Sequence, residues 1–303
     1  MDYERGNIMF GLYFGHYLVD KNKISQSQFY NLMQQHHKTR AKLGLIAVSE
    51  KLLTTKQAEE INEIQKRMDQ RFGDIAIEKG YLLQEEVKYL LNLQGNSYLR
   101  FIQLFTEQNI ITMEELETLL EEYKKANQFT DQELEALKSG DIDRIIPVFV
   151  DMDTPLLGEC VGLAIRNVIR FINSEVVLKR AYRVKDYSFD GLAFQQMKGD
   201  HDIFLGFAGR DKALLEIANP FAKEQYTSLD EDAYDSVCEF INCINGMFAS
   251  KLSHEDIHID MTPPGYYINQ TLASEGDIYI VPMIINGEQT DIVVVVNDQA
   301  VIK

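Results

Sequence analysis

Hydrophobic and polar residues follow two different patterns in the two halves of this chain. From residue 13 to residue 128, apolar residues recur at helical spacing, and the pattern repeats every 29 residues in the blocks 13–41, 42–70, 71–99 and 100–128. Three places in the block are almost always apolar: the seventh holds Val19, Val48, Ile77 and Thr106, the twelfth Ile24, Leu53, Leu82 and Ile111, and the twentieth Leu32, Ile61, Leu90 and Leu119. Each block therefore predicts a short helix, a turn and a longer helix. Because such a pair cannot bury its apolar face alone, we expect neighbouring blocks to stack on one another.

Each of the longer helices has a signal at its start. The thirteenth place of the block and the place three residues later hold Ser25 and Gln28, Thr54 and Gln57, Leu83 and Glu86, and Thr112 and Glu115. A Ser or Thr followed by Gln or Glu at this spacing is a capping box, in which each side chain bonds the backbone N–H of the other residue. Three blocks have the complete box, and the third block keeps only its Glu.

Strands and helices are mixed in the second half. Runs that alternate or are rich in β-branched residues predict strands at 175–184, 202–209, 256–261, 277–285 and 291–297. Helices are expected at 154–172, 211–218 and 232–252. Asn286-Gly287 predicts a hairpin between the last two runs, and the run 291–297 is expected near the centre of the sheet. This order predicts an antiparallel sheet that carries long helices on one face.

These patterns together predict an α+β chain of two domains. We expect residues 1–128 to form an all-α domain of four helical repeats and residues 145–303 to form the mixed domain. Residues 129–144 are expected to connect them, with Gly140 as a helix stop signal.

One helix of the second half carries an unusual polar stripe. At ~100° per residue, Asp235, Glu239, Asn242 and Gly246 fall within roughly 60° of arc. The opposite side holds apolar residues at core-facing spacing: Val237, Ile241, Ile244, Phe248 and Leu252. A carboxylate and a carboxamide one turn apart should therefore point away from the core together. A helix that only fills space would more often carry Lys and Arg there.

Composition narrows the classes of partner. With 45% hydrophobic and 25% charged residues, the chain reads as an ordinary globular protein. Its net charge of −17 argues against binding to nucleic acid or to anionic lipid. We expect a cytoplasmic protein, because no apolar run approaches ~20 residues and no signal peptide is evident. Three cysteines and no zinc-like spacing predict reduced thiols and no metal site.

Blocks two and three resemble a known tandem motif. The segments 42–65 and 71–94 are similar to the MshEN domain at the N-terminus of type II secretion and pilus ATPases, some of which bind cyclic di-GMP. The resemblance implies a helical-repeat fold and these candidate nucleotide-binding residues: Lys42, Gly44, Gln65, Arg71, Gly73, Gly80 and Gln94. The sequence departs from the family pattern at four positions: Lys42 for Arg, Ala47 and Ala76 for Leu, and Lys51 for Gly. A docking or regulatory module without a nucleotide remains the alternative.

The polar stripe resembles the signature of the chemotaxis phosphatases CheC, CheX and FliY. That signature is Asp or Ser, then Glu after three residues, Asn after two more, and Pro a little over twenty residues later. Asp235, Glu239 and Asn242 fit it, with Pro263 and Pro264 following. Gly246 matches a further position of the family helix. CheC carries two such motifs. The earlier helix of this chain offers Glu159 but Gly162 in place of the Asn, so the single motif is more similar to CheX.

This resemblance implies a function and roles for the stripe. The partner would be a phosphorylated CheY-like response regulator, which brings its own Mg²⁺ beside the phospho-aspartate, so that this chain needs no cofactor of its own. Asn242 would position the attacking water, because a carboxamide can donate and accept hydrogen bonds without repelling a phosphoryl group. Glu239 would bond a lysine of the partner. Gly246 would admit the partner's backbone, and Asp235 would hold the helix start or rim the interface.

Two other functions are compatible with the sequence. The chain could be a non-catalytic adaptor that binds a response regulator while its repeats dock elsewhere. Alternatively, the repeats could be a cyclic di-GMP receptor that controls the second half. The sequence leaves open whether the chain forms a homodimer.

Overall fold

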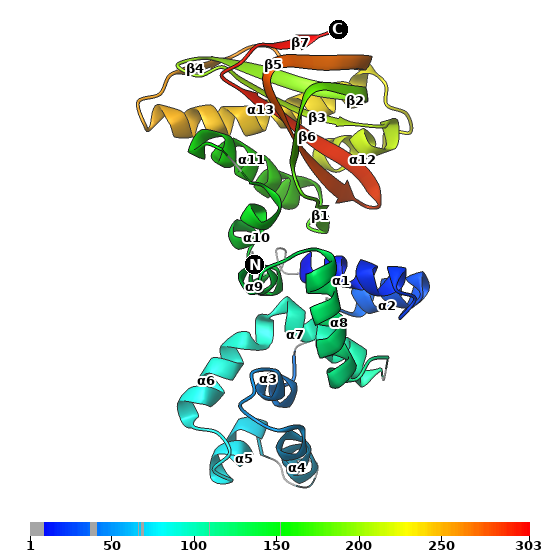
Figure 1. The fold of residues 1–303 in the computed structure, drawn as a ribbon, viewed down its shortest axis with the longest axis vertical. Coiled ribbons are helices and arrows are strands. Elements are labelled where there is room, and N and C mark those ends of the chain that lie inside the picture. The colour runs from blue at the N-terminus through cyan, green and yellow to red at the C-terminus, as the bar shows by residue number, and fades with distance from the viewer. Residues whose placement is uncertain (1–8, 37–40, 66, 68–69, 109, 152) are drawn as a thin grey trace. The chain divides into compact units, whose positions relative to one another are not determined.

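The computed structural model describes residues 9–36, 41–65, 67, 70–108, 110–151 and 153–303. These residues fall into two compact units that part between Asp141 and Ile142. Positions 1–8, 37–40 and 68–69, which belong to the predicted first domain and its first two blocks, lie outside the described residues. The chain is mixed helix and sheet, with the helical repeats in one unit and the sheet in the other (Figure 1).

The helices of the first unit come in pairs, as the repeat predicts. The pairs are α1 (Met9–Asp20) with α2 (Gln26–His36), α3 (Leu43–Ser49) with α4 (Thr55–Gln65), α5 (Phe72–Glu78) with α6 (Gln84–Asn92), and α7 (Ser97–Glu107) with α8 (Met113–Ala126). A short 3-10 helix, η1 (Leu93–Gly95), follows α6, and α9 (Asp131–Ser139) follows α8. The twelfth and twentieth places of every block are at most 5% exposed. These two columns therefore lie in the core of this unit, whereas the seventh place is only partly buried in three blocks and Ile77 is 38% exposed.

The capping boxes form as predicted. Thr112 Oγ1 accepts from the backbone N–H of Glu115 at 3.2 Å, and Glu115 Oε2 accepts from the N–H of Thr112 at 2.9 Å. The pairs led by Ser25 and Thr54 make the same reciprocal bonds. At the third block, Glu86 Oε2 accepts from the N–H of Leu83 at 2.7 Å, and Leu83 has no side-chain oxygen with which to return the bond.

The segment that the sequence predicts as a connection contains helices. Helix α9 begins with a further capping box, in which Thr130 and Glu133 bond each other's N–H groups. It buries Leu134 and Leu137, and it ends at Gly140, whose φ of 69° is the left-handed conformation of a helix stop. Helix α10 (Ile142–Phe149) begins the second unit. The stop at Gly140 is confirmed.

The second unit contains an antiparallel sheet and its covering helices. After α10 come α11 (Pro155–Asn167), the π-helical turn η2 (Val168–Ile172), β1 (Val176–Leu178), β2 (Tyr182–Gly199), β3 (Ile203–Gly209), α12 (Asp211–Ala222), α13 (Glu231–Ser253), β4 (Ile259–Met261), β5 (Gly265–Ile285), β6 (Glu288–Val296) and β7 (Ala300–Ile302). The strand order is β1-β5-β6-β3-β2-β4, and β7 pairs with β5. The hairpin at Asn286-Gly287 forms with φ values of 50° and 85°, the conformation that this dipeptide favours.

Two long strands close part of this sheet into a ring. Strand β5 pairs with β6 through its second half and with β2 through residues 265–273 and again at 278–280, while β2 and β6 both pair with β3. The sequence predicts only one end of each strand: the run 175–184 spans β1 and the first three residues of β2, and the run 277–285 is the last part of β5. Residues 185–199 and 265–276 are not predicted, because much of 185–190 and 267–269 is exposed without an apolar alternation, and 191–197 are largely buried on both faces, so that they do not alternate either. Backbone pairing between β2 and β5 holds the exposed stretches extended without a buried side-chain pattern to reveal them.

The closed sheet has a core on each face. On one face, Phe207 of β3 packs against Phe240 of α13 with ring centroids 5.6 Å apart, and α11, α12 and α13 cover this side (Figure 1). On the other face, Phe204 and Ala208 join a cluster with Leu192, Leu272 and residues of β6. The predicted antiparallel sheet with long helices on one face is confirmed, and β6 lies between β5 and β3, near the centre of the sheet.

Among the described residues, no helix combines the length and the apolar character that crossing a membrane requires.

The incomplete cap at Leu83 predicts a pair of opposite stability effects. Leu83 is 68% exposed, so Leu83→Thr should complete the box without loss of core and stabilise the unit by about 1 kcal/mol. Thr112→Ala should destabilise it by about the same amount. Thermal unfolding should show shifts of roughly 3–5 °C in opposite directions. Equal melting temperatures for both variants and the wild type would contradict the role given to these caps.

Candidate functional site

Helix α13 is fixed in rotation by its apolar face. Its start is capped by Asp230, whose Oδ1 accepts from the N–H of Ala233 at 3.1 Å. The five apolar residues predicted to face the core are at most 1% exposed: Val237, Ile241, Ile244, Phe248 and Leu252. Tyr234 stacks on Tyr266 of β5 with centroids 4.2 Å apart. Asp230, and not Asp235, caps the start of the helix. Of the two roles expected of Asp235, the position at the rim of the stripe therefore remains.

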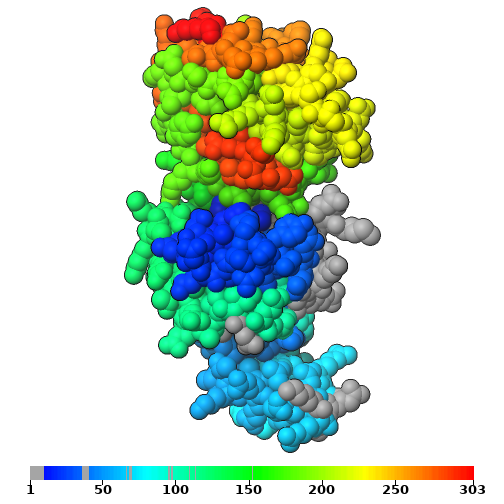
Figure 2. All heavy atoms as spheres, turned by 90° about the vertical axis from the view of Figure 1, so that its right-hand side faces the viewer, coloured from blue at the N-terminus to red at the C-terminus, as the bar shows by residue number. Residues whose placement is uncertain are grey.

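The polar stripe lies on the open side of the helix. Asp235 and Glu239 are exposed, and Asn242 and Gly246 are half-buried. Neither carboxylate has an ion pair or side-chain hydrogen bond within the described part of the chain. Atoms of α13, coloured yellow in Figure 2, lie at the surface of the second unit. We call Asp235, Glu239, Asn242 and Gly246 the polar edge of α13.

Asn242 is held from below by a residue of the sheet. Its Oδ1 accepts from Nε2 of Gln195 on β2 at 2.8 Å. The same Nε2 donates to the backbone carbonyl of Thr262 at 2.8 Å, and Oε1 of Gln195 accepts from Nδ2 of Asn245 at 2.9 Å. The structure gives Nδ2 of Asn242 no partner among the described residues. The carboxamide therefore keeps a free N–H donor and the second lone pair of Oδ1 for a ligand.

Gly246 is not required by the packing of its own chain. Among the described residues outside the neighbouring turns of the helix, a Cβ atom built there would meet only the methyl of Met261 within 4 Å, at 3.9 Å, which is an ordinary contact. Glycine costs roughly 1 kcal/mol in a helix interior relative to alanine. The open space above Gly246 is therefore available to something outside the chain.

The charges of the polar edge act on a neighbouring thiol. Burial, followed by the charges of Asp235 and Glu239, raises the pKa of Cys238 to about 12. Burial also raises the pKa of the Tyr234 hydroxyl to about 12, with smaller effects of Asp211 and Tyr266. These groups stay neutral near pH 7, so the charge of the edge is the charge of its carboxylates. A cationic group of a partner would be attracted to it.

The earlier helix with half of the motif does not form a second edge. Glu159 of α11 pairs with Lys251 of α13 at 2.7 Å, and Gly162 stands where an Asn would be needed. The carboxylate of Glu159 is thus occupied within the unit.

Five of the seven candidate nucleotide-binding residues come together around one cavity in the first unit. The cavity has a volume of about 770 Å³, within the usual range for small-ligand sites, and is lined by Lys42, Gly44, Gln65, Arg71 and Gly73. Leu43, Phe72, Val87 and Leu91 give it apolar walls, and Asp74 is its one carboxylate among the described lining residues.

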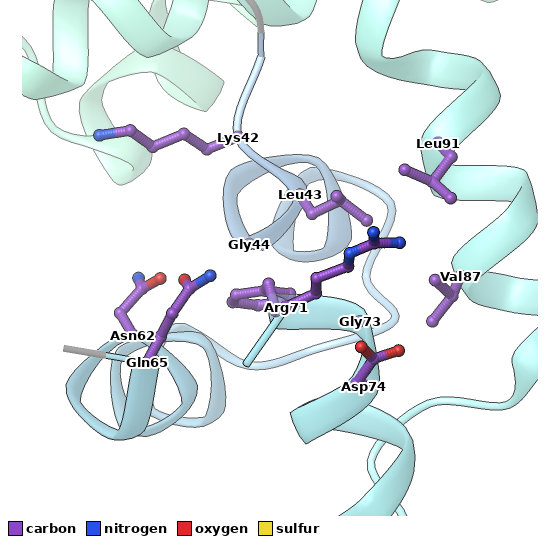
Figure 3. A pocket seen from close by; sticks show the side chains of 11 residues that line it. Lys42, Leu43, Gly44, Asn62, Gln65, Arg71, Gly73, Asp74, Val87 and Leu91 are labelled. Carbon is purple, nitrogen blue, oxygen red and sulfur yellow. The ribbon is translucent and has the colours of Figure 1, made fainter. Parts of the chain in front are cut away.

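The two cations at this cavity differ. In Figure 3 the Arg71 side chain lies between α3 and the helix that carries Val87 and Leu91, and it has no ion-pair partner among the described residues. Lys42 points away and pairs with Glu107 at 2.5 Å. Within the described lining of the cavity, Arg71 is therefore the cation that has no ion-pair partner and could meet a ligand.

Four of the seven candidate residues have structural roles, whether or not they line the cavity: Gly44, Gly73, Gly80 and Gln94. A Cβ on Gly44 would come within 2.9 Å of Phe72, and one on Gly73 within 2.7 Å of Val87, so close helix packing demands glycine at both. Gly80 has a φ of 69° at the turn after α5, and Gln94 donates to the carbonyl of Ala41 at 3.1 Å; neither lines the cavity. Ala47 and Ala76 are fully buried.

Sequence analysis missed Gln195. It is 1% exposed and lies on the helix-facing side of β2, where Gly191, Ala193 and Met197 are its neighbours. The one signal for this residue is a polar side chain among the small and apolar residues of one strand face. It can be recognised only when the strand and its faces are known.

Several solved structures are similar to about half of the chain. The CheC-like superfamily protein from Shewanella sp. PV-4 is 23% identical over 48% of this chain and 99% of that chain, with a TM-score of 0.42. The CheX protein of Vibrio vulnificus is 18% identical over 47% and 99%, with a TM-score of 0.41. The CheX–CheY–BeF3–Mg complex from Borrelia burgdorferi is 17% identical over 47% and 97%, with a TM-score of 0.36. No curated protein matches the chain.

A family model matches the part of the chain that carries the polar edge. Residues 192–302 match the family described as chemotaxis phosphatase CheX. The match covers less than half of the chain and includes Gln195, all of α13 and the Pro263-Pro264 pair. The region that builds the candidate site is thus similar to the CheX family.

Proposed function

We propose that this chain is a phosphatase of a phosphorylated CheY-like response regulator. The observation that carries the proposal is the polar edge: Glu239 and Asn242 point outward from a rigidly packed helix, with groups left free for a ligand. This edge lies in the region that matches the chemotaxis phosphatase CheX family.

The proposed chemistry needs one oriented water. An aspartyl phosphate on the partner sits beside the partner's own Mg²⁺, which neutralises the phosphoryl charge. A hydrolase then has to place a water in line with the leaving carboxylate, and placement of a nucleophile supplies much of such catalysis. Asn242 suits this task, because its N–H donor is free and an uncharged carboxamide does not repel the phosphoryl group.

Glu239 has the better position for docking. A carboxylate that approached the phosphoryl group would be repelled, whereas a charge-assisted bond to a lysine of the regulator would be stabilising. Glu239 and Asn242 are three residues apart and lie on one face of the helix, so a single edge can enter the partner's site. Gly246, one turn further on, leaves room for the partner's backbone.

Substitutions at the two residues should separate catalysis from docking. With an excess of phosphorylated regulator, Asn242→Ala should lower kcat about 10²-fold or more, because the water loses its positioning group. Glu239→Ala should mainly raise KM, roughly tenfold to a hundredfold, because one charge-assisted bond is lost. Steady-state phosphate release measures both. Glu255→Ala, an exposed acidic residue just beyond α13, is the matched control and should change neither.

Wild-type kcat in the Asn242→Ala variant would contradict the proposed catalytic role. Stoichiometric binding by the wild-type chain without phosphate release would instead support the non-catalytic adaptor.

Gly246→Ala should have opposite effects on stability and docking. The methyl group meets nothing closer than 3.9 Å, so better helix propensity should stabilise the second unit by about 1 kcal/mol. It would also keep the partner's backbone away, so KM should rise while kcat stays near the wild-type value. Urea unfolding and steady-state kinetics measure these effects.

The control is Gly73→Ala, where the added methyl would clash with Val87, so this variant should only lose stability. A stabilised Gly246→Ala variant with an unchanged KM would remove Gly246 from the interface.

We infer a second function for the first unit as an MshEN-like domain that binds a phosphate-containing ligand such as cyclic di-GMP. The supporting observation is the cavity around Arg71, which gathers five of the predicted residues next to apolar walls that could meet a base. A guanidinium binds phosphate in a bidentate manner or stacks on guanine, which suits Arg71 to either contact.

Titration of the whole chain with cyclic di-GMP tests this second function. Calorimetry should show binding that Arg71→Ala weakens at least tenfold, because a charge-assisted contact is lost. Lys79→Ala is the matched control, since Lys79 pairs with Glu60 at 2.5 Å and lies outside the cavity. Absence of heat at high micromolar nucleotide would contradict cyclic di-GMP as the ligand.

A further inference from the structure

A buried polar chain lies directly beneath the polar edge of α13. Gln195 is 1% exposed and Asn245 is fully buried, yet both are hydrogen-bonded polar side chains in a largely apolar interface between helix and sheet. Gln195 uses both ends of its carboxamide: the NH₂ group meets Asn242 and Thr262, and the oxygen meets Asn245. Buried groups of this kind are tightly oriented, because any other arrangement leaves polar atoms unpaired.

The network decides which way Asn242 faces. The backbone oxygen of Thr262 can only accept, so the Gln195 atom 2.8 Å away must be the NH₂ nitrogen. The atom of Asn242 that meets the same nitrogen at 2.8 Å must then be its oxygen. The NH₂ group of Asn242 is consequently directed away from Gln195. A single buried glutamine thus determines which edge of the Asn242 carboxamide is available to a ligand.

Gln195 also ties Asn242 to the loop with the proline pair. Thr262 directly precedes Pro263, and its N–H and Oγ1 both donate to the carbonyl of Gln196, at 2.9 Å and 3.0 Å. The loop is therefore anchored to the backbone of β2, one residue away from Gln195. The hydrogen bonds of the Gln195 side chain therefore fix the positions of β2, the loop and α13 relative to one another.

Asn245 lowers the stability of the fold in order to hold Gln195. Its Nδ2 donates to Gln195, but its Oδ1 is buried and has no partner within the described part of the chain. An unpaired buried carbonyl is destabilising, and an aliphatic residue at this fully buried position would avoid it. The benefit of Asn245 in the present structure is the second bond that fixes the carboxamide of Gln195.

From these contacts we infer that Gln195 is a positioning residue of the proposed phosphatase site. It acts through Asn242, whose carboxamide it holds with the NH₂ group directed outward, and it does not contact the partner because it is buried. This inference rests on the proposed function, in which Asn242 positions the attacking water.

The test compares Gln195→Met with Asn242→Ala and with the double variant, using the full chain and an excess of phosphorylated regulator. Methionine has a similar length but cannot donate to Asn242 or Thr262. The single variant should lower kcat tenfold or more and leave KM unchanged. In the Asn242→Ala background the same substitution should cause no further loss, because its target is already gone.

The control variant is Asn167→Leu. Asn167 is also a buried carboxamide of the second unit, 4% exposed, and donates to the carbonyl of Leu163 within α11. Its replacement removes a buried hydrogen bond of similar kind away from the site, so kcat should stay at the wild-type value. Chemical unfolding of each variant gives the stability change against which kcat is compared.

If Gln195→Met does not fold, Asn245→Leu decides the matter. It removes the second bond to Gln195 together with the unpaired oxygen, so the fold should persist while kcat falls several-fold at constant KM. Wild-type kcat in whichever variant is measured, a raised KM, or an equal loss in the Asn242→Ala background would overturn the inference. If Asn242→Ala itself retains wild-type turnover, the proposed function fails and not only the role of Gln195.

Discussion

The burial of one face of α13 against the sheet is the interaction on which the candidate site depends. Five large apolar side chains on that face are almost completely buried, and burial of each contributes roughly 1.5–3 kcal/mol. Rotation of the helix about its axis would return them to water, so the direction of the polar edge is set by the core. Asp230 fixes where the helix begins, and the stacking of Tyr234 on Tyr266 fixes its register along the strand. The outward position of Glu239 and Asn242 is therefore a consequence of packing.

Features that depend on local spacing could be predicted from the sequence. The helix pairs, the capping boxes and the exposed side of α13 each follow from residues within a few turns of one another. Gln195 could not be found in this way, because its bond to Asn242 joins positions 47 residues apart and requires β2 to pass beneath α13. Only one end of each of the long strands β2 and β5 could be predicted, for a related reason. Their exposed sections are held by backbone pairing with each other, which leaves no hydrophobic pattern there.

The two candidate sites differ in how their residues were identified. At the cavity of the first unit, a repeated motif pointed to seven residues and the fold gathers five of them. Gly80 and Gln94 serve a turn and a backbone carbonyl instead. At the polar edge, all four predicted residues share one helix face, and the sequence did not reveal the buried residue that orients Asn242. A sequence motif records residues that recur together, whereas the structure shows which of them are placed by packing and which are free to react.

The tight helix contacts at Gly44 and Gly73 have a consequence for how such motifs diverge. Neither position can accept a side chain without displacing Phe72 or Val87, whatever occupies the cavity beside them. A descendant that had lost every ligand would still keep both glycines, while Arg71 is exposed and has no ion pair with the described residues, so it could be replaced freely. Across related chains, glycine at both positions should therefore indicate only that the helices pack in the same way. An Arg at the position of Arg71 should indicate that the cavity still binds a ligand.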